Sequence, residues 1–158
     1  MTVPQTPTSD NSTYAVKVKL LMALIADCKP QELGVYGELI AMDWLVNTGY
    51  VAEHAKGCDL IVGDVSTGKV HKVEVKASRM SQNGSYEFNL FKRDHTDHKH
   101  SEFVVLLCFC PDGAILPFVI PVTAVLLTNK ITIPTDPRSY TGRFAQYLNL
   151  SGTLSLNE

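Results

Sequence analysis

This 158-residue sequence shows few features of a secreted or membrane protein. Its four cysteines sit mostly in apolar surroundings and follow no regular spacing. No signal peptide is visible, because residues 1–13 are polar and rich in Thr, Pro and Ser. The longest apolar runs, 103–110 and 114–127, are broken by proline or are too short to cross a membrane. These absences favour a cytoplasmic protein with reduced thiols.

The sequence also lacks an excess of basic residues, since its net charge is −2 and its pI is near 6.2. This balance argues against DNA binding through bulk electrostatics. The charges are unevenly spread, however, because residues 71–100 hold six Lys or Arg and four His against four Asp or Glu. Length and composition fit one ordinary globular domain. We expect that domain over residues 14–150, between flexible tails at 1–13 and 151–158.

Two apolar stretches joined by a Ser-Thr-Gly turn, residues 58–63 and 70–77, predict a β-hairpin. Successive side chains of a strand point to opposite faces, so Glu74 and Lys76 share one face. When the strands pair, Asp59 lies near Glu74 on the same side. Two carboxylates and an ammonium that converge at a sheet edge suit a hard divalent cation and a reacting water molecule.

Alternating charged and apolar residues also occur on any half-exposed strand, where they form a solvated face. Two observations favour a functional site. Residues 60–62 are continuously apolar, which predicts a strand buried on both faces. An acidic side chain at the start of such a strand loses hydration energy, so its presence favours a functional role. Upstream, residues 37–49 predict an amphipathic helix that ends at a glycine. Glu38 lies in its first turn, where the helix dipole favours an acid whatever its function.

In order and spacing, the helix acid Glu38, the strand acid Asp59 and the pair Glu74-x-Lys76 resemble the PD-(D/E)XK nuclease superfamily. That superfamily includes restriction-endonuclease-like and Holliday-junction-resolvase-like enzymes. The resemblance covers residues 34–79, and cysteine replaces the family's proline before the aspartate. It implies an α/β fold with a restriction-endonuclease-like mixed β-sheet flanked by α-helices. It also implies that Asp59 and Glu74 bind Mg²⁺ or Mn²⁺, that Lys76 positions the attacking water and that Glu38 supplies a further acid.

The expected function is therefore a metal-dependent endonuclease of restriction or homing type that hydrolyses DNA phosphodiester bonds. A homodimer is expected, because each chain has a single site. A symmetric dimer is the simplest assembly that would cut both strands of a duplex or a junction. One alternative is a structure-selective junction resolvase, and another is a catalytically silent DNA-binding or assembly module of the same fold. The candidate DNA-facing residues are Ser78, Arg79, Gln82, Lys92 and Arg93.

Two other clusters, one of histidines and one of cysteines, offer competing interpretations. Residues 95–100 contain three histidines and an aspartate, which suits a small metal- or nucleotide-binding protein, but their spacing is more typical of a solvated loop. Cys108 and Cys110 lack a second pair and are expected in the core, as are the aromatic residues of the last helix. The rest of the chain predicts helices at 14–28, 121–127 and 138–149, and strands at 86–90, 102–110 and 115–119.

Overall fold

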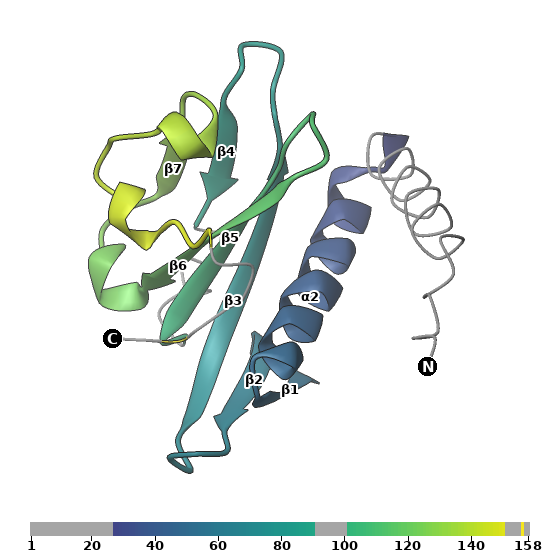
Figure 1. The fold of residues 1–158 in the computed structure, drawn as a ribbon, viewed down its shortest axis with the longest axis vertical. Helices are drawn as coiled ribbons and strands as arrows, with labels where there is room; N and C mark the ends of the chain where they lie inside the picture. Colours follow the sequence, from purple (N-terminus) through teal and green to yellow (C-terminus); the bar gives the residue numbers. More distant parts are fainter. Residues whose placement is uncertain (1–26, 91–100, 151–155, 157–158) are drawn as a thin grey trace, which may run out of the picture.

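The structure is a computed structural model that describes residues 27–90, 101–150 and 156. Figure 1 shows helix α2 (Pro30–Asn47) lying beside a twisted sheet. In chain order the elements are α2 (Pro30–Asn47), β1 (Tyr50–Ala55), β2 (Cys58–Asp64), β3 (Val70–Arg79), β4 (Tyr86–Asn89), β5 (Phe103–Phe109), β6 (Ile115–Pro121), η2 (Val122–Ala124), β7 (Lys130–Ile133), η3 (Pro137–Ser139) and η4 (Ala145–Tyr147), where η marks a 3₁₀ helix.

Five strands form a mixed sheet in the order β1-β2-β3-β5-β6. Strands β3 and β5 run parallel, and every other neighbouring pair is antiparallel. Strands β4 and β7 form a separate two-stranded antiparallel sheet. The expected α/β fold with a mixed sheet is confirmed, and the helix that flanks it in the described part of the chain is α2.

The two faces of the main sheet are covered by different layers (Figure 1). Along β5 the odd-numbered residues, such as Val105 and Leu107, pack in the core beneath α2. Even-numbered residues, such as Val104 and Leu106, pack in a second core with β4, β7 and the C-terminal 3₁₀ segments. All seven residues of β5 are buried, which explains why its sequence is an unbroken apolar run.

Helix α2 lies close against β3 because a glycine faces the sheet. A Cβ atom added at Gly37 would stand 3.0 Å from the Cβ of Ala77, so a larger residue would push the helix away. The helix begins at Pro30 rather than at Gly37, because proline fits the first helical turn and the Glu32 carboxylate accepts a hydrogen bond from the Lys29 N–H at 3.2 Å. It ends, as predicted, before Gly49, which has a φ of +104°.

The C-terminal third differs from the prediction. Residues 138–149 form no α-helix but two short 3₁₀ segments, η3 and η4, and the helix predicted at 121–127 is the three-residue η2. Strand β7 was not predicted. Tyr140 explains part of the difference, because its hydroxyl accepts a hydrogen bond from the Phe144 N–H at 3.3 Å and its ring packs edge-on against Phe118. Tertiary contacts thus replace the local helical bonds that the aromatic spacing suggested.

The strands predicted at 86–90, 102–110 and 115–119 are confirmed within one or two residues as β4, β5 and β6. The helix predicted at 14–28 and the two tails fall almost entirely outside the described residues. Within the described part of the chain, no helix is long and apolar enough to cross a membrane.

Candidate active site

The β2–β3 hairpin brings Asp59 to Glu74. The ladder between β2 and β3 runs from Gly63 and Val70 to Leu60 and Val73, and Asp59 is the next residue of β2 beyond its last pair. Val73 and Val75 lie in the core beneath α2, so Glu74, which alternates with them along β3, points to the other face. The Val75 N–H donates to the Asp59 Oδ2 at 2.8 Å, which fixes this carboxylate against β3.

Glu74 and Lys76 form a close ion pair on that face. The Lys76 Nζ lies 3.0 Å from the Glu74 Oε1, and the two side chains are only 20% and 6% exposed. Next to them on β5 are Val104 and Leu106, which are fully buried. A carboxylate in such surroundings is costly without a cation, and Lys76 supplies one. The three residues that the sequence grouped are therefore neighbours in space.

Glu38 contacts a different residue. Its Oε2 lies 3.4 Å from the Nδ1 of His54. His54 pairs with Leu60, so this contact belongs to the α2 side of the sheet, whereas Glu74 points to the opposite side. No group of three or more His, Cys, Asp and Glu side chains in the described ranges is arranged to hold a metal ion. The structure thus brings together two acids and a lysine, and sets the third acid on another face.

Two carboxylate ligands from the protein are enough to bind Mg²⁺. This ion usually keeps several waters and takes one or two carboxylates, with substrate phosphate completing its shell. Asp59 is partly exposed and Glu74 is buried beside it, so the donor set is hard, anionic and open on one side. The residues present therefore fit a hard divalent cation.

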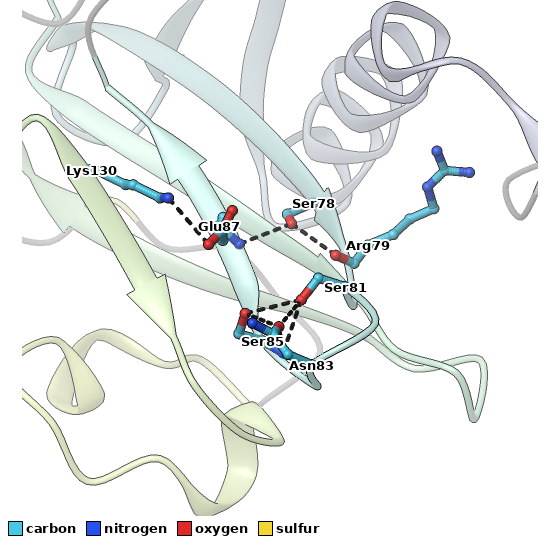
Figure 2. Close-up of polar contacts among 7 residues, drawn as sticks. All are labelled: Ser78, Arg79, Ser81, Asn83, Ser85, Glu87 and Lys130. Carbon is cyan, nitrogen blue, oxygen red and sulfur yellow. Dashed lines mark hydrogen bonds and ion pairs between the residues drawn. The ribbon is translucent and has the colours of Figure 1, made fainter.

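The residues expected to face DNA have different environments (Figure 2). Ser78 is buried, and its Oγ donates to the Arg79 carbonyl at 3.0 Å and accepts the Glu87 N–H at 3.2 Å, which ties β4 to β3. The Arg79 side chain points away from β4, and Gln82 is exposed in the following turn. Residues 92 and 93 lie outside the described part of the chain.

A hydrogen-bonded turn that the sequence analysis missed joins β3 to β4. The Ser85 Oγ donates to the Asn83 Oδ1 at 2.8 Å and lies 3.0 Å from the Ser81 Oγ, which also bonds Asn83 (Figure 2). Gly84, with a φ of +84°, supplies the left-handed residue. The signal was present as a Ser-x-Asn-Gly-Ser run, which is typical of a turn stabilised by its own side chains. The turn fixes where β4 begins.

The competing clusters gain no support. Cys108 and Cys110 are buried, and burial raises the pKa of both thiols, so they remain protonated core residues as expected. The histidine cluster at 95–100 lies outside the described residues. Two surface hollows, of about 490 and 460 Å³, are lined by residues near Phe103 and near Tyr50, and neither includes Asp59 or Glu74.

The fold is similar to that of the bacterial homing endonuclease I-Ssp6803I, with a TM-score of 0.60 at 21% sequence identity. The similarity covers 77% of this chain and 89% of that chain. At this level of identity the similarity establishes a shared fold. No family model matches the sequence, and no curated protein matches it significantly.

Proposed function

We propose that this protein is a metal-dependent DNA endonuclease of the PD-(D/E)XK type. The observation that supports the proposal is the Asp59 carboxylate bonded to the Val75 N–H, next to Glu74, together with the Lys76 ammonium 3.0 Å from the Glu74 carboxylate. This set of groups suits hydrolysis of a phosphodiester. A fold shared with a homing endonuclease supports the same conclusion and favours a homing-type enzyme over a restriction-type one.

Each residue of the site has a distinct role in this mechanism. Asp59 and Glu74 would hold Mg²⁺ or Mn²⁺, which would supply positive charge for the phosphate and lower the pKa of a bound water. Lys76 orients the attacking water, since its three donors lie beside the carboxylate that anchors the site. The Val75 N–H keeps the Asp59 carboxylate in place. The water oxygen adds to phosphorus and loses a proton to solvent, the bond from phosphorus to one bridging oxygen breaks, and that oxygen leaves as a hydroxyl after taking a proton from solvent.

The assembly and the substrate follow from the same site. The described residues contain one such set of groups, so a symmetric homodimer is the simplest way to cut both strands of DNA. A duplex and a four-way junction both present phosphodiesters to this chemistry. The substrate must therefore be determined by experiment, and duplex DNA is the expected one.

The test is cleavage by the full chain of a supercoiled plasmid, a four-way junction and single strands in Mg²⁺, in Mn²⁺ and in EDTA. We expect duplex cleavage with either metal and none in EDTA. Asp59→Asn and Glu74→Gln should each remove about 100-fold or more of the rate, because each takes one ligand from the metal. Lys76→Met should lose a similar factor while DNA binding in Ca²⁺ survives.

Matched controls separate these effects from a general loss of charge. Asp64→Asn and Glu53→Gln remove acids from the far end of β2 and from β1, and should leave plasmid cleavage within about 3-fold of wild type. Cleavage that persists in EDTA, or a fully active Glu74→Gln variant, would contradict the proposal. Binding of DNA without cleavage under any metal would instead identify a silent DNA-binding module.

A further inference from the structure

The two-stranded sheet of β4 and β7 presents four polar side chains as a regular array. In its ladder Glu87 pairs with Thr132, and Asn89 pairs with Lys130. All four are exposed, whereas their neighbours along both strands are buried. Opposite residues share a face, so the array covers one side of the ribbon. The other side, with Tyr86, Phe88, Ile131 and Ile133, packs on the second core.

This ribbon is held firmly at both ends. At its start, the Glu87 N–H donates to Ser78 and the Ser81–Ser85 turn is closed by its own side chains (Figure 2). At its far end, the Leu90 N–H donates to the Asn129 carbonyl at 2.9 Å. A ribbon fixed in this way keeps its outer side chains at set positions, which recognition of a rigid partner requires.

The ribbon and the candidate active site are linked through one strand. Ser78, which anchors the ribbon, lies on β3 with Glu74 and Lys76 at alternate positions, so all three point to the same face. Ser78 lies four positions after Glu74, and this spacing corresponds to about 13 Å along a strand. The ribbon therefore lies on the side of the sheet that carries the site, opposite α2 (Figure 1).

We propose that the outer face of the β4–β7 ribbon reads base pairs in the major groove of the DNA that the active site cuts. The inference rests on the proposed nuclease function and adds the residues that determine specificity. The major groove is about 12 Å wide and admits a two-stranded ribbon. A four-residue strand is about 13 Å long, which corresponds to about three to four base pairs.

The chemistry of the four side chains matches base edges. Asn89 suits adenine, Lys130 suits guanine, Glu87 accepts from the amino group of cytosine, and Thr132 contacts thymine. In the free protein the Lys130 Nζ lies 3.1 Å from the Glu87 Oε1, with both side chains about half exposed, so the face is neutral overall. A neutral face of donors and acceptors fits base reading, whereas phosphate binding requires net positive charge.

The test uses the full chain and a library of DNA duplexes with randomised sequence, whose cleaved products are sequenced. Wild type in Mg²⁺ should cleave a preferred sequence. Asn89→Ala and Lys130→Ala should each lower discrimination at one or two adjacent base pairs by about 10-fold or more. Each variant should also cleave the sequence preferred by wild type about 10-fold more slowly, because one base contact is lost. Lys130→Arg should keep a guanine preference, since arginine makes the same contact.

Two matched variants and two further measurements control the experiment. Asn47→Ala and Lys69→Ala change the same residue types at exposed positions outside the ribbon and should leave the preference unaltered. Thermal unfolding of every variant identifies any that fail to fold. Size-exclusion chromatography tests whether the ribbon instead contacts a second copy of the chain.

The outcomes separate this inference from the nuclease proposal. Wild-type cleavage with a clear preference that Asn89→Ala and Lys130→Ala both leave intact would overturn the ribbon inference alone. Cleavage without any sequence preference would also overturn it. Ribbon variants that alter the oligomeric state and not the preference would assign the face to subunit contact. No cleavage by wild type under any metal would remove the nuclease proposal, and the ribbon inference with it.

Discussion

The Lys76 ammonium lies 3.0 Å from the Glu74 carboxylate, whose side chain is only 6% exposed. In this environment the lysine has a structural role in addition to its proposed catalytic one, because it neutralises a buried charge. Removal of one member of a buried ion pair leaves the other uncompensated and typically costs more stability than removal of both. The pair can therefore be tested in the metal-free protein, independently of cleavage.

Lys76→Met should lower the free energy of unfolding in EDTA by about 3 kcal/mol. The double variant Glu74→Gln, Lys76→Met should lose less than Lys76→Met alone, because no buried charge remains. Added Mg²⁺ should stabilise Lys76→Met more than the double variant, since the ion then offsets the charge of Glu74. Urea unfolding with and without Mg²⁺ measures both effects. A double variant as unstable as the sum of the two single ones would show that the pair is not coupled.

Glu38 should matter less to cleavage than Asp59. It contacts His54 on the α2 side of the sheet, so Glu38→Gln should slow plasmid cleavage by less than about 10-fold. Asp59→Asn should slow it by about 100-fold or more. His54→Ala serves as the control, and its effect should not add to that of Glu38→Gln, because both changes break one contact. A loss in Glu38→Gln equal to that in Asp59→Asn would place Glu38 at the metal.

Ser78 should act on stability rather than on DNA contact. Ser78→Ala leaves the Glu87 N–H without its acceptor, so the free energy of unfolding should fall by about 1–3 kcal/mol. Ser66→Ala is a matched control, because the Ser66 hydroxyl bonds Asp64 in an exposed turn and its loss should cost under about 1 kcal/mol. Equal effects of the two changes, measured by urea unfolding, would refute the assignment.

Alternation along β3 was enough to predict from sequence that Glu74 and Lys76 share a face, and the two side chains lie 3.0 Å apart. Strand β7 could not be predicted in the same way. It has four residues, and its partner lies far away in the chain, because Tyr86 pairs with Ile133. Local patterns carry no information about such distant pairing.

The same limit applies to the contacts of Ser78 and Glu38, whose roles in the site stay predictions. Both have residue types and spacings compatible with a site, but contacts with other elements decide where they point. Ser78 is engaged by β4, and Glu38 by β1. The aromatic spacing at 138–149 was likewise outweighed by contacts such as that of Tyr140 with Phe118.

Leu127 offers a test of backbone strain. It has a φ of +70° and is 98% exposed, so it gains little from burial and carries the cost of a left-handed conformation. That cost is about 1–2 kcal/mol for a residue with a Cβ. Glycine avoids it, but the greater conformational entropy of glycine in the unfolded chain offsets about 0.5–1 kcal/mol of the gain. Leu127→Gly should therefore raise the free energy of unfolding by about 0.5 kcal/mol. A lower stability of Leu127→Gly would show that the leucine makes a compensating contact.

Arg138 donates to both oxygens of Asp136, and this contact holds the pKa of the Asp136 carboxyl at about 2. The unfolded chain has a value of about 3.9. A carboxyl whose pKa is lowered on folding adds stability above its unfolded pKa and loses it as the pH falls through its folded pKa. Asp136→Asn removes the charge but keeps an oxygen that can accept the Arg138 N–H.

This variant should have a lower urea midpoint than wild type at pH 7, by an amount that stays constant down to about pH 5. Between about pH 4 and pH 2 the difference should shrink toward zero, because Asp136 becomes protonated in wild type. Leu127→Gly is the matched control, since it removes no titrating group and its offset from wild type should not vary over the same range. An Asp136→Asn offset that persists unchanged through this window would mean that the ion pair with Arg138 contributes nothing to stability.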